Sequence, residues 1–124
     1  MTVGSRWSCR MPPRHKMLDP EAAELIAARF RVLAEPIRLR ILEILRQNER
    51  SVSELAEEVG TSQPNVSKHL RILQEEGLIG RRQEGNTVFC FIADPTVFEL
   101  CELVCGGIGE RMARKAAALK RARR

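Results

Sequence analysis

The sequence of 124 residues lacks the features that mark membrane proteins, secreted proteins and several large enzyme classes. Its longest apolar runs fall far short of the roughly 20 residues that cross a bilayer. The basic first residues lack the apolar segment of a secretion signal. A glycine-rich phosphate loop, a Ser-His-Asp order and an HExxH pattern are also absent. We therefore expect a cytoplasmic protein that is not an enzyme and does not bind a membrane.

Residues with metal-binding side chains of nitrogen or sulfur are scarce: the chain contains two histidines and four cysteines. In a reducing compartment, cysteines serve as ligands or sensors more often than as structural disulfides. A content of 44% hydrophobic and 30% charged residues is ordinary for a globular protein. The length suits one small domain.

The net charge of +5 is concentrated at the two ends of the chain. Residues 1–17 contain four Lys or Arg and residues 111–124 contain seven, with no acidic residue in either segment. The segment 18–110 carries ten basic and sixteen acidic residues. The overall charge is therefore no argument that the centre of the chain binds DNA, although either basic end could neutralise phosphate or stay solvated.

Residues 51–92 predict two short helices joined by a glycine turn and followed by a β-hairpin. Ser53 is placed to cap the first helix and Gly60 to end it. Thr61 or Ser62 is placed to cap the second helix, whose first turn tolerates its proline. The apolar positions of the two helices recur at helical spacing and predict their buried faces: Leu55, Ala56, Val59, Val66, Leu70 and Leu73.

The polar residues of the second helix are expected to point away from its apolar face. Amide side chains can bond adenine edges, and Lys or Arg can reach guanine or phosphate, so this face is suited to reading a DNA groove. A merely solvated face is the alternative, since polar surface helices are common. The candidate DNA-contacting residues of this helix are Gln63, Asn65, Ser67, Lys68, His69 and Arg71.

The segment after this helix predicts a basic hairpin. Two β-prone runs flank Gly85 and Asn86, a pair that suits a tight turn. Arg81 and Arg82 make the first strand basic and are further candidates for DNA contact. A basic hairpin directly after such a helix is typical of a wing, which favours the DNA-reading interpretation of the helix.

Three motifs resemble the ArsR/SmtB family of winged-helix repressors. They are Leu33-Ala-Glu-Pro-Ile-Arg-Leu-Arg-Ile-Leu42, Ser67-x-His69-Leu70 and Leu73-x-x-x-Gly77-Leu78, within a similarity that runs from about Pro20 to Leu103. The resemblance implies a winged helix-turn-helix fold, mainly α with a small β-hairpin wing (α+β) and about five helices. It also implies a homodimer that binds a double-stranded DNA operator and leaves it when an inducer binds, often a metal ion or metalloid.

The resemblance and the composition together predict three parts. Residues 1–17 are expected to form a flexible arm, residues 18–110 the DNA-binding and dimerisation domain, and residues 111–124 a basic tail. An alternative biological start at Met17 would remove the arm together with its cysteine.

Proline positions predict where the other helices begin. Asp19 and Pro20 should open the first helix, Pro36 the second, and Asp94 with Pro95 the last. We expect the apolar stripes of the first two helices to be buried, and that of the last helix to be only partly covered in a monomer. The first and last helices are therefore candidates for a two-fold dimer interface, as in the resembled family. The stripes comprise Ala23, Ile26, Ala27 and Phe30, then Ile37, Ile41, Ile44 and Leu45, then Val97, Leu100, Cys101, Val104 and Ile108.

Two familiar metal sites of the resembled family are not encoded in this chain. Ala56 and Glu58 replace the cysteines of the family's Glu-Leu-Cys-Val-Cys-Asp-Leu box. The family's second site uses histidines on the last helix, whereas the histidines here are His15 and His69. Neither zinc or nickel sensing nor a constitutive cofactor is expected.

Cys101 and Cys105 provide a different candidate site. Their spacing of four residues places the two Cβ atoms roughly 5 to 6 Å apart on one helix face, where thiolates can hold a soft ion. A disulfide requires a Cβ separation of about 3.5 to 4.5 Å, so ion capture is favoured over a disulfide switch. The alternative is a structural role, since cysteine is often a small buried hydrophobe. Three glycines weaken the helix directly after this pair, so capture could stiffen or bend it.

Trivalent arsenic or antimony is the inducer that we expect first, and it prefers three sulfur ligands, although two thiolates plus a small-molecule ligand are an alternative. Cys90 in the wing and Cys9 in the arm are the available donors. Cys90 could equally be a core residue, and Cys9 could reach over from the other subunit. Cadmium or lead is the nearest alternative inducer, and redox or persulfide sensing is another.

Overall fold

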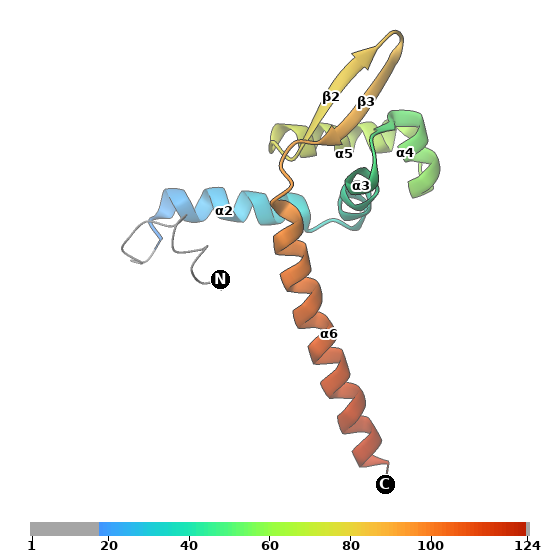
Figure 1. Ribbon diagram of the computed structural model, residues 1–124. Coiled ribbons are helices and arrows are strands. Elements are labelled where there is room, and N and C mark those ends of the chain that lie inside the picture. Colours follow the sequence, from blue (N-terminus) through green and yellow to red (C-terminus); the bar gives the residue numbers. More distant parts are fainter. Residues whose placement is uncertain (1–17, 124) are drawn as a thin grey trace. The chain divides into compact units, whose positions relative to one another are not determined.

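The computed structural model describes residues 18–123, so the arm with Trp7, Cys9 and His15 lies outside the described part. Two units are distinguished, residues 1–31 and residues 32–124, and each is considered by itself. Figure 1 shows the order of the elements along the chain. They are α2 (Pro20–Leu33), α3 (Pro36–Gln47), β1 (Arg50–Ser51), α4 (Val52–Val59), α5 (Gln63–Glu75), β2 (Ile79–Glu84), β3 (Thr87–Ile92) and α6 (Val97–Ala122). The predicted class, mainly α with a small β wing, is confirmed, although the short strand β1 was not expected.

Helix α2 begins as its sequence predicts. The Asp19 carboxylate accepts a hydrogen bond from the backbone N–H of Ala22 at 2.7 Å, and Pro20 occupies the first helical position. Within the first unit taken by itself, two members of its apolar stripe are exposed, Ile26 at 42% and Phe30 at 50%.

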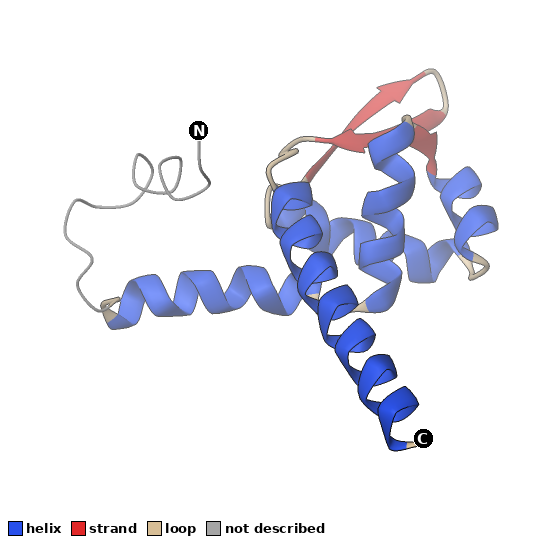
Figure 2. Cartoon of the chain, turned by 60° about the horizontal axis from the view of Figure 1, so that its bottom comes forward, coloured by secondary structure: helices blue, strands red, loops and turns tan. Residues whose placement is uncertain are grey.

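The core of the second unit lies between α3, α4 and α5 and the three-stranded sheet, which Figure 2 shows along one side of these helices. The strand order is β1-β3-β2, and both pairs are antiparallel. The predicted apolar faces of α4 and α5 are confirmed as buried. Fully buried side chains come from all these helices, the turn after α5 and the wing: Ile41, Leu42, Leu55, Val66, Leu70, Leu73, Leu78 and Cys90.

The cap of α4 is Ser51, and the expectation that Ser53 caps this helix is wrong. The Ser51 hydroxyl accepts from the backbone N–H of Glu54 at 3.2 Å, and the Glu54 carboxylate accepts from the backbone N–H of Ser51 at 2.8 Å. This reciprocal pair is a capping box. It holds the pKa of Glu54 below its usual value, because the ionised carboxylate is the better acceptor. Gly60 ends the helix in the left-handed region, at φ 83°, as expected.

The hairpin β2–β3 has the predicted two-residue turn, Gly85 and Asn86. Gly85 adopts φ 63°, a value that glycine tolerates without strain. Gly80 pairs with Phe91, and a Cβ at this glycine would lie 2.5 Å from the Cζ atom of that ring. The missing side chain thus lets the Phe91 ring cross the base of the wing.

Helix α6 starts at Val97, not at Asp94 or Pro95. The Asp94 carboxylate instead accepts from the backbone N–H of Thr96 at 3.0 Å, which orders the turn before the helix. The helix runs without a break through its three glycines to Ala122, so it includes most of the basic segment after residue 110. None of the described helices combines the length and apolarity that a bilayer crossing requires.

The capping box gives a direct test of this architecture. Ser51→Ala should lower the free energy of unfolding by about 1 kcal/mol, because the first turn of α4 loses its side-chain acceptor. Glu57→Gln, at an exposed position of α4 away from the cap, is the control and should change stability little. Urea unfolding of both variants measures the difference, and equal losses would contradict the assignment of the cap.

Candidate nucleic-acid interface

The rotation of α5 about its own axis decides which of its side chains can meet DNA. Ser62 caps the helix by accepting from the backbone N–H of Asn65 at 3.3 Å, and Pro64 sits in the first turn. The fully buried residues Val66, Leu70 and Leu73 fix one face against the core. The opposite face exposes Gln63, Lys68 and Arg71.

Two of the predicted contact residues, Asn65 and Ser67, are only half-buried. The amide Nδ2 of Asn65 donates to the Thr61 hydroxyl at 3.0 Å, so this side chain also orders the turn between α4 and α5. Their place at the start of α5 agrees with a helix whose N-terminal residues enter a groove.

His69 is buried, with 6% of its surface exposed, and the expectation that it points outward with the polar face is wrong. Its Nδ1 atom lies 3.0 Å from Nη1 of Arg38 on α3. Burial lowers the pKa of His69, Glu35 acts in the opposite direction, and Arg38 and Lys68 reinforce the decrease. The spacing from Val66 to Leu73 already contained the signal, because position 69 lies between them on the same helical face.

Arg81 and Arg82 lie on neighbouring positions of β2 but have different surroundings. Arg81 is half-buried opposite Cys90, and its Nε atom has no hydrogen-bond partner among residues 18–123. Cys90 is fully buried, which raises the pKa of its thiol against the opposing effect of Arg81. Cys90 is therefore a core residue, which was the alternative interpretation of this cysteine.

Arg82 is exposed and held by two carboxylates. Its Nη2 lies 2.6 Å from Glu49 and its Nη1 lies 3.0 Å from Glu84, while the guanidinium sits 5.0 Å from the centre of the Phe89 ring. The hydrogen bonds to these carboxylates raise the pKa of Arg82. Exposed ion pairs of this kind are worth about 0–1 kcal/mol, so a phosphate can replace a carboxylate at modest cost.

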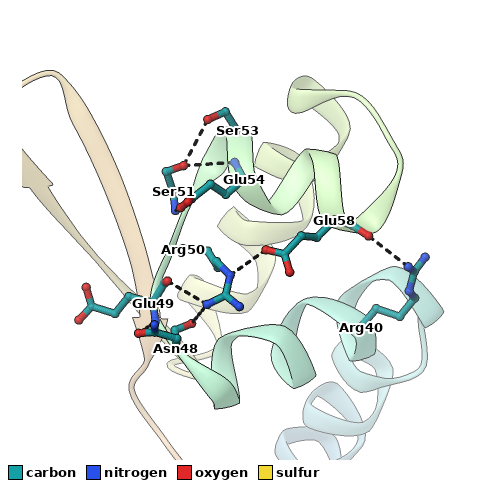
Figure 3. A network of polar contacts seen from close by, with 8 residues as sticks. All are labelled: Arg40, Asn48, Glu49, Arg50, Ser51, Ser53, Glu54 and Glu58. Carbon is teal, nitrogen blue, oxygen red and sulfur yellow. Dashed lines mark hydrogen bonds and ion pairs between the residues drawn. The ribbon is translucent and has the colours of Figure 1, made fainter.

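A polar network supports the connection that carries Glu49 (Figure 3). Arg50 donates to the Glu58 carboxylate at 2.7 Å and to the main-chain carbonyls of Asn48 and Glu49 at 3.0 and 3.1 Å. Arg40 donates to the Val59 carbonyl at 3.0 Å, next to the end of α4. The network ties the connection between α3 and α4 to both helices. Sequence reasoning did not find it, because most of its acceptors are main-chain atoms.

The predicted thiol pair lies on the first turns of α6. Cys101 is half-buried and packs against the core, whereas Cys105 is exposed, and both are free thiols. Burial raises the pKa of Cys101, with Glu43 and Glu102 adding to the increase and Arg46 opposing it. Within residues 18–123 no three Cys, His, Asp or Glu side chains are grouped as metal ligands. Cys90 therefore does not complete a three-ligand site with this pair inside one chain, and Cys9 lies outside the described residues.

Fold and interface together define a winged helix-turn-helix DNA-binding protein. The family model described as "Bacterial regulatory protein, arsR family" matches residues 35–80. An uncharacterised HTH-type transcriptional regulator of Mycobacterium tuberculosis, Rv0081, is 41% identical over 78 residues, which cover 62% of this chain and 68% of that protein. A probable mercury resistance operon repressor of Streptomyces lividans is 39% identical over 74 residues, covering 60% and 59% of the two chains.

Solved structures agree with this assignment. The crystal structure of M. tuberculosis Rv0081 superposes with a TM-score of 0.72 and 33% identity, covering 80% of this chain and 99% of that one. The solution structure of the homodimeric winged helix-turn-helix domain of Mb0332 from Mycobacterium bovis gives a TM-score of 0.66 at 32% identity, covering 80% and 94%. The chain belongs to the ArsR family, and it is a DNA-binding transcriptional repressor rather than an enzyme.

The exposed cations of α5 and the wing are predicted to contact DNA. Lys68→Ala and Arg82→Ala should each weaken operator binding and reduce the slope of log affinity against log salt by about 1, because each removes one phosphate contact. Gln47→Ala, at the exposed end of α3, is an uncharged control that should leave the slope unchanged. Fluorescence anisotropy titrations across a salt series provide the measurement. Unchanged affinity in both cationic variants would refute the docking of this face.

Proposed function

We propose that the protein is a homodimeric repressor that leaves its operator when a soft metalloid binds the thiolates of Cys101 and Cys105, with trivalent arsenic or antimony as the first candidates. The observation that carries this proposal is the placement of two free thiols on consecutive turns of α6, one exposed and one packed on the core. An ion can reach Cys105 from solvent. When Cys101 then binds the ion, the effect reaches the core, because the Cys101 side chain packs against buried residues.

The first turns of α6 are joined to α3, which provides a route from the thiols to the DNA-reading helix. The Arg46 guanidinium donates to the Glu102 carboxylate at 3.0 Å and lies 4.7 Å from the centre of the Phe98 ring. Phe98 is itself in the core that α3 and α5 share. Movement of α6 at Cys101 would therefore displace α3, against which α5 packs.

The glycines after the thiol pair make α6 deformable. Apart from the neighbouring residues and backbone of α6 itself, no described atom would lie within 4 Å of a Cβ at Gly106, Gly107 or Gly109, so close packing does not account for them. Each lowers the intrinsic stability of a helix by up to about 1 kcal/mol relative to alanine. Ion capture that stiffens or bends this segment is a way to shift the population between DNA-binding and released forms.

The candidate inducers differ in the number of sulfur ligands that they require. Trivalent arsenic and antimony favour three sulfur ligands, and the third would come from Cys9 or from another subunit. A soft divalent ion that is satisfied by two thiolates is the second candidate, and mercury is included because the Streptomyces relative is named as a probable mercury resistance repressor. Cadmium and lead remain further alternatives. For every such ion, the raised pKa of Cys101 makes capture release a proton and strengthen with rising pH.

A homodimer is supported by the uncovered face and the charge pattern of α6. Val104, Ile108 and Met112 are 52%, 54% and 64% exposed on successive turns. Residues 97–110 contain three Glu and no Lys or Arg, whereas residues 111–123 contain six Lys or Arg and no acidic residue. Two copies of the helix packed antiparallel would place opposite charges beside each other and cover the apolar stripes.

The sensing proposal is tested by operator release. Arsenite, antimonite, Hg²⁺, Cd²⁺, Pb²⁺ and peroxide should be added to the native protein–DNA complex and to complexes of Cys101→Ser, Cys105→Ser and the double variant. At least one thiophilic ion should release the native protein, and the double variant should need at least about tenfold more of it, because both soft ligands are gone.

Two control variants sharpen this assay. Cys90→Ala changes a buried thiol that lies apart from the pair, and it should respond like the native protein. Cys9→Ser should lose sensitivity to the three-coordinate metalloids if the arm supplies the third sulfur. A double variant that responds normally to every inducer would show the sensing proposal to be wrong.

The dimer proposal has a separate test. Ile108→Glu places a carboxylate in the exposed stripe, and burying it against a second copy should weaken the dimer by about 2–3 kcal/mol or more. Ile108→Leu, which keeps the position apolar, is the control and should not shift the equilibrium by a comparable amount. Sedimentation equilibrium measures both, and a native protein that is monomeric at micromolar concentration would contradict the proposal.

A further inference from the structure

One guanidinium connects three segments of the second unit. The Nε atom of Arg38 donates to the main-chain carbonyl of Val32 at 2.6 Å, one residue before the end of α2. Its Nη1 atom lies 3.0 Å from Nδ1 of His69, in the middle of α5. The Glu35 carboxylate accepts from the backbone N–H groups of Ile37 and Arg38 at 2.7 and 3.2 Å, which fixes the turn of α3 that carries this arginine.

The contact between Arg38 and His69 specifies the protonation of the imidazole. A guanidinium has only donors, so Nδ1 of His69 must offer its lone pair, and the proton of the neutral ring must be on Nε2. An imidazolium has no lone pair to offer, and its charge would face the charge of Arg38 at the same distance. The hydrogen bond therefore exists only while His69 is neutral.

His69 occupies a sensitive place on α5. It is buried on the face that packs on the core, and its neighbours Lys68 and Arg71 are on the exposed face. Adjacent positions of a helix are separated by about 100° around its axis, so a small rotation that relieves His69 also turns these two cations.

We propose that Arg38 is a positioning residue for DNA recognition: by holding His69 from α3, it sets the rotation of α5 that presents Lys68 and Arg71 to the groove. The proposal rests on the docking of α5 argued above and adds a requirement that docking alone does not have. DNA affinity must depend on the acceptor at position 69, although this side chain is buried and does not touch DNA.

This arrangement predicts that stability and sequence-specific DNA affinity both decrease as the pH falls. Burial lowers the pKa of His69, Arg38 and Lys68 add to the decrease, and Glu35 opposes it. Below the ordinary value of 6.5 the unfolded chain takes up a proton before the folded chain does, so stability is lost as pH falls below that value. Once the folded His69 is protonated, the bond to Arg38 breaks and sequence-specific affinity falls.

The experiment measures affinity for a duplex selected from random DNA by the native protein, and for an unrelated duplex, at pH 7.5 and pH 5.5 and constant ionic strength. His69→Leu keeps an apolar side chain in the core but removes the hydrogen-bond acceptor. Arg38→Lys keeps the charge but cannot contact Val32 and His69 at the same time. Each should bind the selected duplex about tenfold more weakly at pH 7.5, as the loss of a charge-assisted hydrogen bond permits, with a smaller change for the unrelated duplex. His69→Asn, whose short amide restores an acceptor near the Nδ1 position, should stay within about threefold of the native protein.

The pH arm needs no variant that risks misfolding. Native affinity for the selected duplex should decrease over the pH range in which NMR shows the folded His69 taking up a proton, and His69→Asn should not show this decrease. His15→Gln, the control for the other histidine, should behave like the native protein. Stoichiometric titration with DNA gives the folded, active fraction of each sample.

The proposal is overturned if native affinity stays constant across the pH range in which NMR shows folded His69 becoming protonated, or if His69→Leu matches the native protein in both duplexes. Loss of affinity in Lys68→Ala and Arg71→Ala within the same assay would then show that the docking stands while the positioning role fails. The proposal is also overturned if His69→Leu weakens binding to the selected and unrelated duplexes equally. A rotated reading face must change the discrimination between the two duplexes.

Discussion

Burial of one face of α5 is the interaction on which the DNA-reading surface depends. Val66, Leu70 and Leu73 are completely buried, and each such side chain contributes about 1.5–3 kcal/mol when it leaves water. A rotation that exposed them would lose most of that free energy, so the core fixes the outward direction of Lys68 and Arg71. His69 adds a directional polar contact to this apolar packing. The apolar residues hold the helix in place, and the hydrogen bond from Arg38 defines its rotation more narrowly.

One of the four cations of the reading segment, Arg82, is already paired with carboxylates. Arg82 is paired with Glu49 and Glu84, and the segment 61–90 has four basic against three acidic residues. Its attraction for phosphate is therefore local and depends on exchange of partners rather than on a strong positive field. Basic residues without acidic neighbours are concentrated at the two ends of the chain, in residues 1–17 and 111–124. Recognition and electrostatic attraction thus reside in different parts of the chain.

The sequence allowed the repeating elements to be predicted, because they depend on periodicity and local turn chemistry. The faces of α4 and α5, the caps at Asp19 and Ser62, and the hairpin turn at Gly85 are all short-range features. The cap at Ser51 was missed although its partner Glu54 is three residues away, because a second serine lay close to it. The contact from Arg38 to His69 spans 31 positions and that from Glu49 to Arg82 spans 33, and no local pattern reveals such pairs. The roles of the DNA-contacting side chains and of Cys101 and Cys105 remain predictions.

A fixed reading helix is joined in this protein to a deformable helix that carries two thiols, and two copies of α5 are expected to enter successive major grooves of one operator. Methylation interference on the selected duplex tests this claim most directly, because methylation of guanine N7 blocks the major groove and methylation of adenine N3 blocks the minor groove. We predict two clusters of interfering guanines whose centres are about 10 base pairs apart, on the same side of the duplex. A single cluster, or interference confined to adenine N3, would contradict it.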